Sequence, residues 1–350
     1  MMTIASSLGD YQVEFHLDLD FFKGLQAMPG SVFLFDARVW ELYARRLEAH
    51  LDPARIRTFA VGEEVKNLGG VESIYDLLLG QGVRRGATLV AVGGGVLQDL
   101  AGFSASTLFR GLPWVFVPTT LLAQGDSCIG GKTSLNHRSA KNLLGTFWPP
   151  RQVHVSSAFL PTLSREDFFS GLGEALKLHL IGGARDTAAY RAAQAALHAR
   201  DDQATLAVVR RALEIKKGYI EQDEFDGAAR LLLNYGHCFG HALESTSGFR
   251  IPHGQAVVAG MMLANAVSLR RGLLPEAEAE AVQALLHDGL VTPPVLPELE
   301  PGALVKAIGS DKKRTGKGLA VILLQAGHRL AQHQDMTPEE VAWAVQSTRF

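Results

Sequence analysis

Three histidines and one glutamate have the residue types of a divalent-metal site. His237 and His241 are four residues apart, a spacing that places both side chains on one face of a helix. His253 follows in a loop-like segment, and Glu174 lies upstream among apolar residues and glycines, where a carboxylate needs a partner or a metal ion. Imidazole and carboxylate ligands are typical of Zn²⁺ sites that keep one coordination position open. The pattern predicts such a site, with ordinary polar histidines as the alternative, and it does not decide whether His241 is a ligand.

A glycine-rich turn could bind phosphate oxygens. Gly93-Gly94-Gly95 follows an apolar run over 88–92 that is typical of a buried strand, and a helical pattern follows over 97–108. Glycine lets the backbone approach a ligand closely, and the amides at the start of a helix attract anions. Thr119-Thr120 comes after a second such strand, at 115–117, and would offer two hydroxyls at the same carboxyl edge of a parallel sheet. The pattern favours a phosphate-binding edge, although it lacks the G-x-G-x-x-G spacing of a dinucleotide site and could serve only to reverse the chain.

Cationic side chains also stand among apolar residues and glycines. Lys132 follows Gly130-Gly131, and Arg230 leads into the apolar run at 231–233. Each cation alone is most often a solvated surface residue, but a convergent set suits a small substrate with several negative charges. The candidates for such a set are Arg110, Lys132, Lys141, Lys177, Lys216, Arg230 and Lys312.

Length and composition limit the classes of protein that can hold these residues. The chain has 350 residues, 47% of them hydrophobic, and a formal net charge of −2. This near-neutral balance argues against a broad nucleic-acid surface, which needs a basic excess. Two cysteines cannot form a disulfide scaffold, and we find no signal-peptide pattern and no apolar run of about 18 residues. We expect a cytoplasmic globular protein of two domains, with no membrane or nucleic-acid partner.

Two patterns along the chain position the candidate residues. Strand-like and helix-like segments alternate over residues 1–150, which predicts βαβ units and a parallel sheet. Helical patterns dominate from about residue 164, and short strands over 319–334 resemble a hairpin. The chain is therefore expected to be α/β at first and mainly α-helical afterwards.

An alternating run near the N-terminus offers a second group of possible metal ligands. Apolar and polar residues alternate over 15–21, which predicts a half-buried strand. His16, Asp18 and Asp20 would then lie on its solvated face. We expect these three side chains to face water rather than a metal ion.

Taken in order, the motifs resemble those of the 3-dehydroquinate synthase family of sugar-phosphate cyclases. The similarity extends from about residue 55 to residue 325, and the set is highly specific although each part alone is weak. The motifs that carry it are Gly62-Glu63-Glu64-Val65-Lys66, Gly93-Gly94-Gly95-Val96-Leu97-Gln98-Asp99, Arg110-Gly111, Val117-Pro118-Thr119-Thr120, Asp126, Gly130-Gly131-Lys132-Thr133, Lys141-Asn142, Leu232-Leu233-Asn234-Tyr235-Gly236-His237, Gly240-His241 and Asp311-Lys312-Lys313.

The resemblance implies two domains with an active site in the cleft between them. A Rossmann-like, parallel-sheet domain over residues 1–155 would bind NAD⁺, and a mainly α-helical domain over residues 156–350 would bind the metal. The residues implied around NAD⁺ are Glu63, Lys66, Gly95, Val96, Asp99, Thr119, Thr120, Lys132, Lys141 and Thr162. The metal would be Zn²⁺, or Co²⁺ in its place, and the implied ligands are Glu174, His237 and His253, with His241 on the substrate instead.

The resemblance also implies a phosphorylated sugar acid as substrate, 3-deoxy-D-arabino-heptulosonate 7-phosphate. Its phosphate would contact Lys132, Asn142, His241, Lys312 and Arg110, the last from the second subunit of a homodimer. Its carboxylate and ring hydroxyls would contact Lys216, Arg230, Asn234, Asp126 and Lys177. The implied reaction is transient oxidation by NAD⁺, β-elimination of phosphate, re-reduction and aldol closure to 3-dehydroquinate. The net result is a carbon–oxygen lyase reaction of the shikimate pathway.

Two other classes of enzyme remain open. Related cyclases act on sedoheptulose 7-phosphate or other sugar phosphates that lack the carboxylate, and metal-dependent polyol dehydrogenases share the two-domain plan. The implied carboxylate- and phosphate-binding residues are all present, which favours the phosphorylated sugar acid. Asp226 stands where the family usually has glutamate, and Gly173 where it commonly has alanine. These departures leave the exact substrate open.

Overall fold

The computed structural model describes residues 1–138, 140–309 and 319–350, and the chain divides into two compact units. Unit 1 comprises Met1–Leu163 with Arg200–Arg210, and unit 2 comprises Ser164–Ala199 with Arg211–Phe350. The assignment of cofactor binding to residues 1–155 and of metal binding to residues 156–350 stays a prediction.

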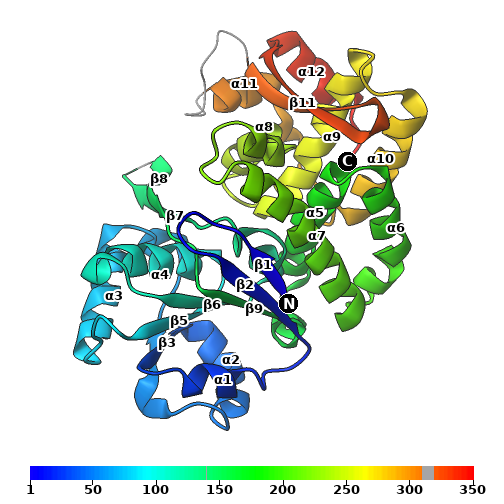
Figure 1. Cartoon of the computed structure of the whole chain (residues 1–350). Helices are drawn as coiled ribbons and strands as arrows, with labels where there is room; N and C mark the ends of the chain where they lie inside the picture. The colour runs from blue at the N-terminus through cyan, green and yellow to red at the C-terminus, as the bar shows by residue number, and fades with distance from the viewer. Residues whose placement is uncertain (139, 310–318) are drawn as a thin grey trace. The chain divides into compact units, whose positions relative to one another are not determined.

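A seven-stranded sheet forms the centre of unit 1, in the order β1-β2-β9-β6-β5-β3-β4 (Figure 1). The edge pair β1–β2 is antiparallel, and each of the other neighbouring pairs is parallel. This confirms the predicted parallel-sheet, Rossmann-like region. The strands are β1 (Met2–Ile4), β2 (Tyr11–His16), β3 (Ser31–Asp36), β4 (Ile56–Phe59), β5 (Thr88–Gly93), β6 (Trp114–Pro118) and β9 (Gln152–Ser156).

Helices cover both faces of this sheet, so its central strands are apolar throughout. Helices α1 (Phe22–Ala27) and α2 (Ala37–Leu47) pack on one face, where Phe22 and Tyr43 join a buried cluster with Val115. Helices α3 (Leu68–Gly80) and α4 (Gly95–Thr107) lie on the other face (Figure 1). A separate antiparallel hairpin, β7 (Lys132–His137) and β8 (Ala140–Phe147), packs beside α4.

Unit 2 is built around helix α9 (His253–Arg270), which is buried over most of its length. Four other helices and a strand pack against it, so it is the central element of a mainly α-helical unit, as predicted. The other helices are α5 (Arg165–Ile181), α6 (Ala184–His198), α7 (Asp202–Gln222), α8 (His237–Thr246), α10 (Glu276–Gly289), α11 (Pro301–Gly309) and α12 (Pro338–Ser347). Residues of α7 up to Arg210 are assigned to unit 1 and the rest to unit 2. The expected hairpin is formed by β10 (Leu319–Gln325) and β11 (Arg329–Met336).

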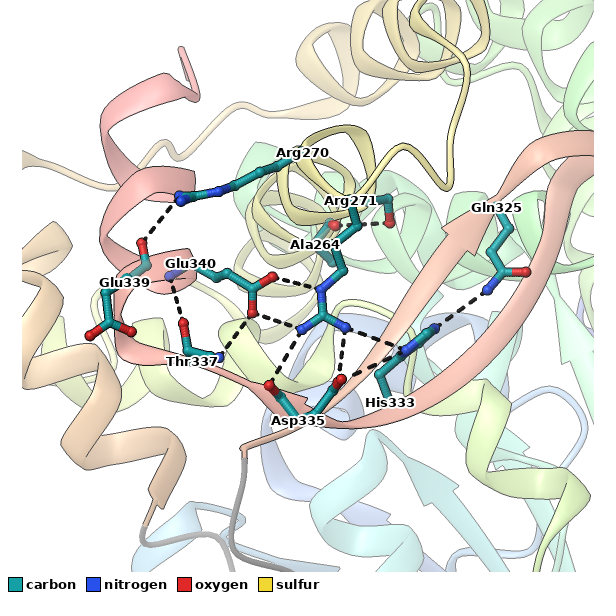
Figure 2. Close-up of polar contacts among 10 residues, drawn as sticks. Ala264, Arg270, Arg271, Gln325, His333, Asp335, Thr337, Glu339 and Glu340 are labelled. Atoms are coloured by element: carbon teal, nitrogen blue, oxygen red, sulfur yellow. Dashed lines mark hydrogen bonds and ion pairs between the residues drawn. The ribbon is translucent and has the colours of Figure 1, made fainter.

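An arginine at the end of α9 connects three elements of unit 2 (Figure 2). Arg271 donates from Nε and Nη2 to the two carboxylate oxygens of Glu340 on α12, at 2.6 and 2.7 Å. Its Nη1 donates to Asp335 on β11, at 2.8 Å. Glu340 also closes a capping box with Thr337 at the start of α12. The largely buried guanidinium group of Arg271 therefore helps to hold the C-terminal helix to the central helix.

The structure differs from the sequence predictions at two places that matter for function. The strand predicted over 15–21 ends at His16, and Leu17 is exposed because the chain turns there into α1. The His16 side chain, expected to face water, is 18% exposed. His253, expected in a loop, is the first residue of α9, because Pro252 in an extended conformation precedes it and starts the helix. Among the described residues, no helix has both the length and the apolar character to cross a membrane.

Candidate metal and substrate site

Close contact between helices α5 and α9 brings two candidate ligands together. Gly254 on α9 lies so near α5 that a Cβ atom there would overlap the carbonyl oxygen of Ser170. A Cβ atom on Gly173 would lie 2.5 Å from the carbonyl oxygen of Gly254. Because Glu174 follows Gly173 and His253 precedes Gly254, the crossing places these two side chains next to each other. The glycine at 173 therefore has a packing reason in this chain.

A second glycine contact positions the third candidate ligand. Gly236, with φ at 81°, adopts the left-handed conformation immediately before α8. A Cβ atom on Gly260 of α9 would overlap the carbonyl oxygen of Gly236. His237 is the first residue of α8, so this contact brings it onto α9.

The three side chains form a compact cluster. Glu174, His237 and His253 each offer one ligand atom, and these atoms lie within 4.8 Å of one another. His253 Nε2 is 3.3 Å and His237 Nε2 is 3.7 Å from Oε1 of Glu174. The Glu174 side chain is fully buried, and Nζ of Lys177 lies 2.5 Å from its Oε2. The structure thus brings together the three residues implied as metal ligands, and their role as ligands stays a prediction.

The cluster fits a divalent cation. Within the described residues, neither carboxylate oxygen of Glu174 has a hydrogen bond of good geometry, although both have ion-pair contacts. Buried polar groups are normally hydrogen-bonded, so this carboxylate has the spare acceptor capacity expected of a metal ligand. One carboxylate and two imidazole nitrogens are a known ligand set for zinc with one position left open.

Burial and neighbouring charges set the protonation of the cluster. Burial would raise the pKa of Glu174, but Lys177, followed by the two histidines, holds it well below its usual range. Burial, assisted by the charge of Lys177, keeps the pKa of His237 well below its ordinary value. Burial would also lower the pKa of His253, but Glu174 and Glu244 together raise it to about 10. The cluster therefore holds a buried negative charge with cationic partners around it.

A further carboxylate contacts the outer side of this cluster. Oε2 of Glu244 is 3.1 Å from Nδ1 of His253. With His241 these two residues offer a second set of three ligand atoms within 4.8 Å of one another. His241 itself is exposed, and its ring lies 5.3 Å from that of His237, as expected for residues four apart on α8. Glu244 was not predicted, because no motif marks it and only its tertiary contact shows its place.

Buried cations accompany the cluster in unit 2. Lys177 on α5, Lys216 on α7 and Arg230 in the turn Ala229–Asn234 have exposures of 2%, 7% and 4%. Nη1 of Arg230 donates to the carbonyl oxygen of Glu224 at 2.8 Å. Charged side chains are rarely so buried without a function or a partner. Asn234, also implied in substrate binding, ends the same turn as Arg230.

An unpredicted carboxylate shapes the loop before Arg230. Asp223 accepts hydrogen bonds from the backbone amides of Gly227, Ala228 and Arg230, at 2.8, 2.8 and 3.0 Å. These bonds lower the pKa of Asp223 to about 2. Asp226 sits inside this loop with φ at 64°. Aspartate tolerates this left-handed conformation better than most residues, which gives the aspartate at this position a backbone reason.

The glycine turn and the two threonines meet at one edge of the sheet in unit 1, as predicted. The backbone amide of Thr119 donates to the carbonyl oxygen of Gly93 at 3.0 Å, across the ends of β6 and β5. A Cβ atom on Gly94 would lie 3.0 Å from Cγ2 of Thr120. The missing side chain leaves the backbone open at the start of α4, whose first residues are Gly95 and Val96.

Four predicted residues form a polar network beside this edge. Nζ of Lys66 is 2.6 Å from Oδ2 of Asp99 and donates to Oδ1 of Asn142 at 2.7 Å. Ser134 donates to both of these acceptors, from its hydroxyl, at 2.8 and 2.9 Å. Burial raises the pKa of Asp99, although Lys66 opposes the shift. Asn136 links the network to Glu63, to which it donates at 2.7 Å.

Ser134 and Asn136 belong to this network, although the sequence did not reveal them. Both are short polar residues on β7, and nothing in their local pattern separates them from ordinary strand residues. Only the packing of the β7–β8 hairpin beside α4 brings them to the network.

Apart from Lys312, the remaining predicted residues lie elsewhere in unit 1. Arg110 is exposed in a turn where φ is 64°, and Thr162 is held by Tyr43 at 2.9 Å between the two hydroxyl oxygens. Asp126 lies in the helical turn Ala123–Ser127, Lys132 begins β7 and Lys141 lies on β8. Lys312 is outside the described residues.

The fold has a close counterpart among solved structures. A 2-epi-5-epi-valiolone synthase from Streptomyces hygroscopicus subsp. jinggangensis 5008, solved with NAD⁺ and Zn²⁺ bound, is similar over 98% of both chains. The TM-score is 0.83 and the sequence identity 28%. The chain therefore has the fold of the sugar-phosphate cyclases.

Sequence comparison places the chain within that class. Residues 56–170 match the N-terminal family model of 3-dehydroquinate synthase, and residues 171–314 match the C-terminal one. The 3-dehydroquinate synthase of Geotalea uraniireducens is 43% identical over 259 residues, 74% of this chain and 72% of that protein. The enzyme of Streptococcus pneumoniae serotype 4 is 35% identical over 324 residues, 88% of this chain and 90% of that protein. The chain belongs to the 3-dehydroquinate synthase family.

Proposed function

We propose that this chain is a 3-dehydroquinate synthase, a carbon–oxygen lyase of the shikimate pathway. It converts 3-deoxy-D-arabino-heptulosonate 7-phosphate into 3-dehydroquinate and inorganic phosphate. Membership of the family supports this activity, and the cluster of Glu174, His237 and His253 is the observation that carries it. The valiolone synthase was solved with NAD⁺ and Zn²⁺, which supports the same cofactors here, with Co²⁺ as an alternative metal.

The cluster in unit 2 would hold the metal and orient the reacting alcohol. Bound there, a divalent cation supplies Lewis-acid polarisation of a substrate oxygen. Glu174 provides the buried negative charge, and His237 provides a nitrogen ligand that is already neutral. His253 would provide a second neutral nitrogen once a cation displaces its extra proton. Lys177, whose Nζ lies next to Glu174, would donate to a ring hydroxyl and so fix the orientation of the sugar.

The sheet edge in unit 1 would hold the nicotinamide cofactor. NAD⁺ supplies a hydride acceptor that is regenerated within one turnover. The amides at the start of α4 and the hydroxyls of Thr119 and Thr120 suit its phosphate groups. Lys66 and Asp99, already paired, offer a donor and an acceptor for its ribose hydroxyls. We place this site within residues 1–155 and the metal site within residues 156–350.

The cations would bind the two anionic groups of the substrate. Lys216 and Arg230 suit the carboxylate, because a buried cation pairs more strongly with an anion than an exposed one does. Asn234 follows Arg230 in the same turn and adds an amide donor. Lys132, Asn142 and His241, with Lys312 and a partner's Arg110, suit the phosphate. Holding both ends of the chain favours elimination of phosphate and the later ring closure.

A phosphate-release assay tests the proposal. Purified chain with NAD⁺ and Zn²⁺ is expected to release inorganic phosphate from 3-deoxy-D-arabino-heptulosonate 7-phosphate without accumulation of NADH. Net accumulation of NADH would indicate a polyol dehydrogenase instead. Exclusive turnover of sedoheptulose 7-phosphate would indicate a cyclase of the valiolone synthase type, the second candidate that the structural similarity favours.

We also propose a cytoplasmic homodimer in which Arg110 reaches the phosphate of the partner's substrate. Arg110 is exposed and its turn is fixed by Gly111, where a Cβ atom would lie 2.8 Å from the ring of Trp148. Light scattering of the purified chain measures the oligomeric state. Mixing an Arg110→Ala variant with a Lys216→Ala variant is expected to restore part of the activity, because each mixed dimer then has one complete site. An absence of restoration in confirmed mixed dimers would contradict the shared site.

A further inference from the structure

A second group of metal-ligand side chains lies on the sheet of unit 1, outside the residues used above. Glu14 and His16 alternate along β2, so both side chains point to the same face. In the parallel register Glu14 pairs with His154 of β9, which puts all three on one face. Gln152, two residues before His154 and on the same face of β9, pairs with Val115 of β6. Val115 belongs to the buried cluster with Phe22 of α1 and Tyr43 of α2, so this is the face that these two helices cover.

The geometry of this group matches that of a metal site. Nε2 of His16 is 3.1 Å from Nδ1 of His154, and Oε2 of Glu14 is 3.7 and 3.9 Å from these two nitrogens. Two nitrogens bound tetrahedrally to one Zn²⁺ at about 2.0–2.1 Å lie about 3.3 Å apart. The separations from Glu174 to its two histidines in unit 2, 3.3 and 3.7 Å, span a similar range. One ion can therefore reach all three atoms with small side-chain movements.

Neighbouring groups hold the two rings in the orientation that a metal needs. The side-chain oxygen of Gln152 lies 3.3 Å from Nε2 of His154, so it accepts that N–H and leaves the lone pair of Nδ1 toward the group. Phe21 stacks on both imidazoles, with centroids 4.3 Å from His16 and 5.1 Å from His154. Partners of this kind fix the tautomer and rotation of ligating histidines in metalloproteins.

The group is accessible and its nitrogens are available. The side chains of Glu14, His16 and His154 are 33%, 18% and 6% exposed, so an ion can enter past the carboxylate. Burial lowers the pKa of His154 to about 4, and burial also lowers the pKa of His16. Neutral imidazole is the ligand form. Without a metal, one N–H···N hydrogen bond between the rings accounts for their contact.

We propose that Glu14, His16 and His154 form a second divalent-metal site, distinct from that of Glu174, His237 and His253. Its ligand chemistry suits Zn²⁺, Co²⁺ or Ni²⁺, which favour imidazole, rather than Mg²⁺ or Ca²⁺, which favour oxygen. The ion replaces the proton shared by the two rings and takes Glu14 as its third ligand. The site does not depend on the proposed function, because none of its residues has a role in it.

Metal counting on the full chain tests this proposal. The chain is stripped with a chelator and equilibrated with Zn²⁺ by dialysis, and bound zinc is measured. Wild type is expected to bind two equivalents, His253→Ala one, and the double variant His253→Ala/His16→Gln none. His253→Ala/His137→Gln, which changes an exposed histidine on β7, is the matched control and is expected to keep one. One equivalent in wild type and none in His253→Ala would overturn the second site.

A milder variant guards against loss of the fold. Glu14→Gln, at the most exposed of the three residues, keeps the size of the side chain and is expected to weaken zinc binding at this site by about tenfold or more. Circular dichroism would confirm that the fold is kept. Unchanged zinc affinity of the second equivalent in Glu14→Gln, or its retention in His16→Gln, would contradict the ligand set. A wild-type chain that binds two equivalents of zinc but lacks the proposed activity would count against the proposed function alone.

Discussion

Nδ1 of His253 lies 3.1 Å from Oε2 of Glu244, while Nε2 of the same ring lies 3.3 Å from Oε1 of Glu174. The imidazole is therefore held between two carboxylates, one on each side. Glu174 comes from α5 and Glu244 from α8, so two helices fix the ring at the start of α9. A carboxylate on the far nitrogen of a ligating histidine orients the ring and strengthens its lone pair. Glu244 would thus be a positioning residue for the metal, without contact to the substrate.

Substitution of Glu244 is expected to weaken metal binding. Glu244→Ala removes the acceptor for Nδ1 and should lower zinc affinity about 10- to 100-fold, measured by competition with a chelator. Glu244→Gln keeps an oxygen acceptor without the charge and should lose less. The ratio of the zinc affinities of the two variants separates the effect of ring orientation from the effect of the carboxylate charge. Equal affinity of wild type and Glu244→Ala would show that the ring needs no such support.

The two overlapping ligand sets make opposite predictions for His241 and His237. The buried carboxylate belongs to the set with His237, so we expect His237→Ala to lose the metal of unit 2 and His241→Ala to retain it. His241→Ala should instead raise the KM for the phosphorylated substrate, because its exposed ring is assigned to the phosphate. Zinc content and steady-state kinetics of both variants measure these effects. Retention of the metal in His237→Ala would favour the set with His241 and Glu244.

The central strands of the sheet could be predicted from the sequence, because the apolar runs that indicate them are local features of the chain. The strands around Val90 and Val115 are buried on both faces and read as continuous apolar runs. The prediction that the strand continues after His16 was wrong for the opposite reason. Leu17 is exposed, Leu19 lies in the turn before α1, and Phe22 is the first residue of that helix. The alternation of residue types there therefore reflects the packing of a turn and a helix start rather than a strand.

The candidate site was only partly accessible from the sequence. Residues such as Glu174 and His237 could be proposed as metal ligands from a resemblance covering most of the chain. Ser134 and Glu244 could not, because each reaches its partner through a contact between different elements of the fold. His16 was assigned to water for the same reason, since its partner His154 is 138 residues away.

The glycine crossing of α5 and α9 should be intolerant of a side chain. Gly254→Ala would force a Cβ atom into the carbonyl oxygen of Ser170, which is backbone and cannot rotate away. We expect the helices to separate, with a loss of stability of about 1–3 kcal/mol and of zinc binding in unit 2. Gly218→Ala on α7 is the control, because no atom lies within 4 Å of its Cβ position. That control should be stabilising by about 0.5–1 kcal/mol. Thermal unfolding of both variants measures these changes in stability, and a stable Gly254→Ala that still binds zinc in unit 2 would contradict the crossing.

The ion pair that attaches the C-terminal helix should make stability depend on pH in the acid range. Hydrogen bonds from Arg271 lower the pKa of Glu340 in the folded state (Figure 2). A lowered folded-state pKa means that the ionised group stabilises the fold above its unfolded pKa, and this contribution is lost as pH falls through the folded-state value. Charge-assisted hydrogen bonds of this kind contribute about 1.5–3 kcal/mol.

Arg271→Met is therefore expected to lower the free energy of unfolding at pH 7 and to reduce its fall between about pH 5 and pH 3, measured by urea denaturation at several pH values. Arg270→Met is the matched control. It removes the adjacent cation, whose guanidinium carbon lies 5.2 Å from the centroid of the Trp343 ring on α12, and it leaves both bonds from Arg271 to Glu340 in place. Its acid dependence should stay close to that of wild type. A similar loss in both variants would assign the effect to net charge instead of to the Arg271–Glu340 pair.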